Sequence, residues 1–150
     1  MRAIRLAVSV CILVTTVCHV HAEKVDMPPN ALRDTATHVI VGTVVQIYER
    51  KETDRDWTTT FYLTEIRTKE IEKGEEIKMG DLVYIRYWTR TWVGGNTRPR
   101  PTNTNGHRNL PKSGESLRIY MARNAYDGFG TTSDGGFNVI GANGFEKLKE

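Results

Sequence analysis

Residues 82–92 read LVYIRYWTRTW, and the rest of the chain is arranged around this stretch. Successive side chains of a β-strand point to opposite faces of the sheet, so alternation divides the stretch into two sets. One set suits a face packed on a core and comprises Val83, Ile85 and Tyr87. The other interleaves aromatic rings with guanidinium groups and comprises Tyr84, Arg86, Trp88, Arg90 and Trp92. We therefore expect a strand with one buried face and a second face suited to binding.

The second set has two alternative roles. As a ligand platform, its rings would stack on sugar or base planes, and its guanidinium groups would pair with carboxylate, sulfate or phosphate. Alternatively, the rings cover the side of a barrel or pack under the following loop, with the arginine stems lying over them. The sequence leaves both roles open.

A long polar loop, residues 93–114, follows the strand. Between Asp81 and Glu115 the chain has no acidic residue. The same interval carries six positive charges, on Arg86, Arg90, Arg98, Arg100, Arg108 and Lys112. Loops longer than about 12–15 residues are usually functional or disordered. The loop is therefore either a disordered insertion or a flexible basic clamp formed by Arg98, Arg100, His107 and Arg108.

Residues 1–22 have the pattern of a secretory signal peptide. Arg2 and Arg5 provide a positive start, residues 6–17 are apolar, and Val20-His21-Ala22 resembles a small-residue cleavage site. The apolar run is shorter than the roughly 20 residues that cross a bilayer. We expect cleavage after Ala22, a secreted or periplasmic protein, and no transmembrane segment in the mature chain. An uncleaved membrane anchor is the alternative.

Cleavage changes how composition is interpreted. Both cysteines, Cys11 and Cys18, lie in the signal, so the mature chain has no disulfide, thiolate metal site or cysteine nucleophile. Of 21 basic residues 19 remain, against 18 acidic ones, which gives a net charge of +1. Residues 82–114 alone carry six positive charges, so the mature protein is polarised rather than basic. The remaining length suits a single domain.

The rest of the chain predicts a mainly β fold. Residues 23–29 form a mobile or extended lead-in, and Asn30 can cap a short helix that runs to Ala36. Strands are expected at 38–48, 57–68, 82–92, 116–122 and 137–140. In the second of them, Trp57, Phe61 and Leu63 share one face.

The connections between these strands also have sequence signals. Gly42 inside the first strand indicates a bulge or bend. The charged residues 49–56 predict a hairpin loop, and residues 69–78 predict a turn. The expected domain, residues 30–150, is a single five-stranded antiparallel OB-like barrel with a short N-terminal helix.

Four segments carry a resemblance to a known family. They are THVIVGTV at 37–44, KGEEIKMGDLVYIRY at 73–87, LPKSGESLRIYMAR at 110–123 and DGGFNVIGANGFEKL at 134–148. Together they resemble the small secreted OB-fold domains of the netrin-like and TIMP-like kind, including bacterial members. The resemblance implies the OB fold and binding through loop tips. The resemblance does not imply metalloproteinase inhibition. Those inhibitors present an N-terminal cysteine to the protease zinc, whereas the mature chain expected here begins near Glu23 and has no cysteine.

No catalytic or metal-binding motif is present. The chain lacks a G-x-S-x-G elbow, a phosphate-binding glycine loop and an H-E-x-x-H motif. His38 and His107 are far apart, and the glycine-rich residues 127–134 lack the ligand pattern of a calcium loop. The sequence predicts a protein that is not an enzyme and holds no cofactor or metal. A hydrolase with an unrecognised site is the weakest alternative.

The leading hypothesis is a binding module without catalytic activity. Its ligand would be an acidic polysaccharide, another anionic or sugar-rich polymer, or an acidic protein. A mature charge close to neutral and export from the cytoplasm argue against nucleic acid. The alternative is a protein-interaction or inhibitor domain of the netrin-like type that acts through its loop tips.

Overall fold

The computed structural model describes residues 24–95, 106–125 and 135–148. It is mainly β, with one short helix. In chain order the elements are α1 (Pro29–Thr35), β1 (His38–Asp54), β2 (Trp57–Lys73), β3 (Leu82–Trp92), β4 (Ser116–Arg123), β5 (Phe137–Val139) and β6 (Phe145–Lys147). The five expected strands are all present, and β6 adds a short strand in the segment that follows Asn143-Gly144.

The strands form one sheet that closes on itself in a ring. The order is β1-β2-β3-β5-β4-β6, and β1 also pairs with β4. The β3–β5 pair is parallel, with Ile85 opposite Phe137 and Arg86 opposite Asn138. This corrects the expectation of an entirely antiparallel sheet. The parallel pair arises because β5 returns along β3 after the chain has passed through β4, so the two strands run in the same direction.

Strand β1 closes the ring because it pairs with two neighbours at once. Residues 39–43 lie between β4 along one edge and β2 along the other. The β1–β2 register shifts between Val41 and Gly42 and again between Val44 and Gln46. The bulge expected at Gly42 is therefore confirmed. A Cβ atom on Gly42 would lie 2.3 Å from Cγ2 of Ile66 and 2.8 Å from the carbonyl oxygen of Arg67, so only glycine fits.

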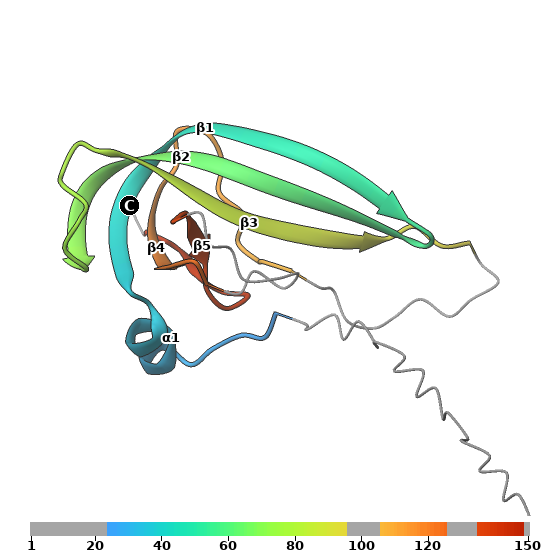
Figure 1. Ribbon diagram of the computed structural model, residues 1–150, viewed down its shortest axis with the longest axis horizontal. Helices are drawn as coiled ribbons and strands as arrows, with labels where there is room; N and C mark the ends of the chain where they lie inside the picture. The colour runs from blue at the N-terminus through green and yellow to red at the C-terminus, as the bar shows by residue number, and fades with distance from the viewer. Residues whose placement is uncertain (1–23, 96–105, 126–134, 149–150) are drawn as a thin grey trace, which may run out of the picture.

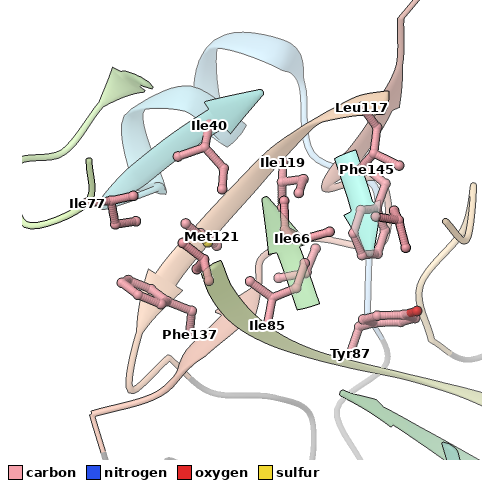
Figure 2. Packing of buried hydrophobic residues seen from close by; sticks show 13 residues of the cluster. Ile40, Ile66, Ile77, Ile85, Tyr87, Leu117, Ile119, Met121, Phe137 and Phe145 are labelled. Carbon is pink, nitrogen blue, oxygen red and sulfur yellow. The ribbon is translucent and has the colours of Figure 1, made fainter. Parts of the chain in front are cut away.

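The ring encloses the main core (Figure 2). Every strand contributes side chains to this core, and β6 contributes Phe145. As expected, Val83, Ile85 and Tyr87 are buried. The Tyr87 ring stacks on Tyr62 at 4.8 Å and meets the edge of Phe145 at 4.9 Å. Its hydroxyl lies 2.9 Å from that of Thr64. Burial raises the pKa of Tyr87 to about 12, so this phenol stays neutral and hydrogen-bonded.

Helix α1 closes a second, smaller core against β4. Leu32, Ala36 and Val39 pack with Tyr120, Ala122 and Ile140 there. The N-cap lies two residues before the expected Asn30: Pro28 occupies that position without a side-chain hydrogen bond, and Pro29 starts the first turn. Proline is well suited to the first position of a helix, because the backbone N–H that it lacks would have no hydrogen-bond partner within the helix there.

The lead-in before α1 is extended and hydrogen-bonded to the C-terminal part of the chain. The backbone N–H of Ala142 donates to Val25 O at 3.0 Å. The Asn143 side chain accepts from the Met27 N–H at 3.0 Å and donates to the Met27 carbonyl at 2.9 Å. Residues 24–28 therefore follow the path of the 140–143 segment.

The far halves of β1, β2 and β3 extend beyond the ring as a three-stranded arm, residues 46–65 and 87–92 (Figure 1). The expected loop at 49–56 is wrong, because β1 and β2 continue to Asp54 and Trp57 and only two residues turn the chain. Ion pairs along each face offset the charges, with Arg50 3.0 Å from Glu52 and Lys51 3.3 Å from Glu49. The turn expected at 69–78 is also shorter, since β2 reaches Lys73.

Within the described residues, the model contains no helix of the length and hydropathy needed to cross a membrane.

His38, the first residue of β1, is buried at the point where the ring meets the turn after β2. Its Nδ1 lies 2.9 Å from the Thr37 hydroxyl, and its ring meets the edge of Phe137 at 4.8 Å. Its Nε2 has no hydrogen-bond partner in the part of the chain that the structure describes. Burial lowers the pKa of His38 below its usual value, the charge of Arg123 lowers it further, and Glu76 opposes the shift.

We expect Gly42→Ala to lower the free energy of unfolding by about 1–3 kcal/mol, because overpacking at the β1–β2 contact must displace Ile66 or the backbone. Gly95→Ala is the matched control, since a Cβ atom there has nothing within 4 Å. Urea denaturation of both variants measures the difference. Equal stability of the two variants would contradict the close approach at Gly42.

We also expect stability to fall as the pH drops below the pKa of His38 in the unfolded chain, about 6.5. The folded-state pKa is lower. The unfolded chain therefore binds the proton first, and the stabilisation present above this pH is lost as the pH falls through the window between the two values. Urea denaturation at pH 7.5 and 5.5 should show a smaller pH-dependent loss for His38→Asn than for the wild type. An unchanged loss would assign the effect to other groups.

Candidate binding face

The outer side of β1, β2 and β3, along the arm and the adjoining part of β3, gathers aromatic and arginine side chains. The cross-strand register places Tyr48 opposite Leu63 and Leu63 opposite Arg86, and it places Arg50 opposite Phe61. Because Ile85 and Tyr87 point into the core, their neighbours on β3 point to the other side. We call this outer side the aromatic–arginine face. It comprises Tyr48, Arg50, Trp57, Phe61, Leu63, Tyr84, Arg86, Arg90 and Trp92.

Two arginines of this face are stacked on aromatic rings of β2. The guanidinium carbon of Arg50 lies 5.3 Å from the centroid of the Phe61 ring, and that of Arg90 lies 4.8 Å from the Trp57 ring. Trp92 meets Trp57 edge to face at 5.1 Å and supports the second stack. Contacts of this kind attract a cation to the ring face and limit its motion. Both guanidinium groups therefore lie against aromatic rings in the free protein.

A shallow groove of about 270 Å³ lies between the first stack and the base of the arm. Phe61, Leu63 and Tyr48 form its apolar lining, and Arg50 and Arg86 are at its sides. Tyr48 is 50% exposed and Leu63 is 37% exposed. The groove offers apolar contact beside positive charge.

Acidic side chains from β1 and β2 moderate the charge of the face. Glu52 pairs with Arg50, whose side chain is 72% exposed. An ion pair this exposed contributes little, so an incoming anion can replace Glu52. Glu65 accepts a hydrogen bond from the Tyr48 hydroxyl at 3.1 Å, and this bond together with the Glu65 charge raises the pKa of Tyr48. The face is therefore arginine-rich without being strongly basic.

Trp88 does not belong to the exposed part of the face. It alternates with Arg86 and Arg90 as the sequence indicates, but it is only 3% exposed. Gly106 lies against it, since a Cβ atom there would be 3.1 Å from Cε3 of the Trp88 ring. The structure corrects the assignment of Trp88 to the ligand-binding set, because the segment after the loop covers it. At Trp88 the alternative role given above applies, in which the ring packs under the following segment.

His107 is a structural residue that fastens this segment to two strands. Its side chain is buried, and Nε2 lies 3.0 Å from the Val139 carbonyl oxygen. Nδ1 lies 3.0 Å from the Trp88 carbonyl and 3.2 Å from the Trp88 amide nitrogen. With both ring nitrogens used within the fold, the expected role of His107 as a donor to a ligand is corrected as well.

The other expected clamp residues are Arg98, Arg100 and Arg108. Arg108 forms an ion pair with Asp26 of the lead-in at 2.7 Å. Arg98 and Arg100 lie outside the described residues. Of the residues proposed from the sequence, the structure brings together Tyr84, Arg86, Arg90 and Trp92, which all come from β3.

Two larger hollows contain charged groups that are already paired. One, of about 410 Å³, lies where β3, the turn after β2 and the start of β5 meet, and its Arg123 pairs with Glu76 at 2.5 Å. The other, of about 350 Å³, lies between α1 and β6, and its Glu146 pairs with Arg118 at 2.9 Å. Within residues 24–95, 106–125 and 135–148, no three His, Cys, Asp or Glu side chains are grouped so as to hold a metal ion.

Five residues of the face were absent from the set predicted from sequence: Tyr48, Arg50, Trp57, Phe61 and Leu63. Alternation in 57–68 already placed three of these on one side of β2. What was missing was the register, which sets that side beside the arginine side of β3 rather than beside its core side. Arg50 was missed because residues 49–56 were assigned to a loop, and Tyr48 was missed because it ends the strand expected at 38–48.

Comparisons with known proteins return no match, whether the chain is compared with family models, curated proteins or solved structures.

Proposed function

We propose that this protein is a non-catalytic binding module that takes an acidic, sugar-rich polymer on its aromatic–arginine face. The observation that carries the proposal is the groove beside Phe61, where apolar side chains and two arginines meet on an open sheet surface. An acidic sugar has both properties, an apolar ring face and an anionic group. Guanidinium groups pair with carboxylate or sulfate through charge-assisted hydrogen bonds.

The size of the groove favours a polymer over a protein partner. Stable protein–protein interfaces bury about 800 Å² on each partner around well-packed anchors. The groove is narrow and shallow by comparison, and polar or charged side chains such as Arg50 and Glu52 surround it. A chain of small rings can contact such a surface one unit at a time.

The stacking pairs favour sugar acids over nucleic acid. Single-stranded nucleic acids are held mainly by bases stacked on aromatic side chains. On this face Arg50 already covers Phe61 and Arg90 already covers Trp57. The groups presented outward are thus guanidinium donors together with the rings of Tyr48 and Tyr84, which are 50% and 48% exposed.

We further propose that the ring is an OB-like barrel. Its five main strands follow a non-consecutive order, with β1 shared between β2 and β4, as in a closed Greek-key barrel. Barrels of this type bind oligosaccharides and oligonucleotides on the surface of strands 2 and 3. The aromatic–arginine face includes that surface. We further propose that residues 1–22 direct export and are removed, so that the mature protein meets polysaccharide outside the cytoplasm.

The experiment compares two neighbouring cations on opposite faces of β1. Arg50→Ala removes a guanidinium group from the aromatic–arginine face, and Lys51→Ala removes the same charge from the reverse face. Each residue is exposed and pairs with one glutamate of its own strand, so the two variants are closely matched. Isothermal titration with a pectic acid or a sulfated polysaccharide gives the affinities.

We expect Arg50→Ala to weaken binding about tenfold, as the loss of one charge-assisted contact implies, and Lys51→Ala to change it by less than about twofold. Equal losses in both variants would show that only overall charge matters. A wild-type protein that binds none of the polysaccharides would overturn the proposed function and leave the protein-interaction alternative.

A further inference from the structure

The aromatic–arginine face contains two similar arginine–aromatic pairs, and the aromatic rings of both pairs lie on β2. Arg50 stacks on Phe61, and Arg90 stacks on Trp57. Phe61 and Trp57 are four residues apart on β2 and lie on the same side of the sheet. At 3.3–3.4 Å per residue this separation is roughly 13 Å along the strand.

The two pairs lie on opposite sides of β2. Arg50 comes from β1 and Arg90 from β3, and β2 runs between them. Thr59, between the two rings on the same side of β2, is small and buried, so no large side chain of β2 separates the pairs. A ligand that touches both guanidinium groups therefore crosses β2 obliquely while it runs toward the end of the arm.

We propose that the face binds acidic oligosaccharides by two points of contact, one at each arginine–aromatic pair, and so selects chains long enough to reach both. This inference rests on the proposed function and adds a ligand class: polymers with an anionic group on repeating units, as opposed to single acidic sugars. A monosaccharide is shorter than the separation of the pairs, so it occupies one pair only. Once one pair is occupied, binding at the second becomes intramolecular and adds affinity without a new kind of contact.

The stacking explains why two points of contact are effective here. Long arginine side chains normally lose conformational freedom when they bind, and this loss opposes affinity. Arg90 is held by Trp57, and its Nε is buried with no hydrogen-bond partner among the described residues. Arg50 is held by Phe61 and by the exchangeable ion pair with Glu52. Both groups are therefore partly ordered in the free protein.

The test uses oligogalacturonates of increasing defined length, from the monosaccharide upward, titrated into the wild type, Arg50→Gln, Arg90→Gln and the double variant. Glutamine keeps much of the side-chain length and removes the charge. Lys51→Gln is the control on the reverse face. Circular dichroism and urea denaturation establish that each variant is folded, and a single-stranded oligonucleotide of matched length tests the other class of polyanion.

We expect wild-type affinity to rise steeply, by about a hundredfold, once the chain reaches the second pair. Each single variant should lose this rise and bind long chains no better than short ones. Arg50→Gln and Arg90→Gln should then be strongly non-additive on long chains, because either change removes the second point of contact.

Two other outcomes have separate meanings. Wild-type binding that is independent of length, or single variants that keep the rise, would overturn the two-point inference and leave the proposed function intact. Absence of binding at every length, or tighter binding of the oligonucleotide, would overturn the proposed function and the inference together.

Discussion

The close approach of β1 to β2 at Gly42 is the constraint on which the rest of the structure depends. There the backbone of β1 comes so near to Ile66 and Arg67 that no side chain fits. The bulge lets one strand pair with β4 along its first half and bend away afterwards. Without that bend the ring would not close around Ile40, Ile66 and Ile119 (Figure 2).

The same bend creates the surface to which we assign function. Beyond residue 45, β1 leaves β4 and continues with β2 and β3 as the arm, so one face of the sheet there is not covered by any other strand among the residues that the structure describes. Aromatic side chains on such a face would be an aggregation hazard if left bare. Two of them are capped by Arg50 and Arg90 instead. These two arginines place polar groups over the rings and present two cationic groups to the solvent.

Much of the fold could be predicted because it depends on local signals. Alternation in 82–92 correctly separated the buried Val83 and Ile85 from the outward arginines, and Gly42 marked the bulge. The length of the hairpin could not be predicted in this way. Charged residues such as Arg50 and Glu52 are typical of loops. In the structure they form an ion pair along one face of β1, which explains how a long hairpin can contain them.

The site was harder to predict because it depends on contacts between distant segments. Alternation places Trp88 on the outer face, but its burial depends on Gly106 and His107, which follow a long connection. The importance of Phe61 likewise depends on the register that sets it beside Arg50. Neither relation has a signal in the local pattern of residues. The first requires the position of the segment after the loop, and the second requires the register between β1 and β2.

The most direct measurement of the central assignment is the response of the three tryptophan indole N–H signals in a ¹H–¹⁵N NMR spectrum as an acidic polysaccharide is added. Trp57 and Trp92 lie on the aromatic–arginine face at the end of the arm, and Trp88 is buried beneath the segment that contains His107. We expect the signals of Trp57 and Trp92 to shift in a saturable way while that of Trp88 stays in place. A polysaccharide that binds and shifts none of the three, or Trp88 alone, would place the ligand elsewhere and contradict the assignment.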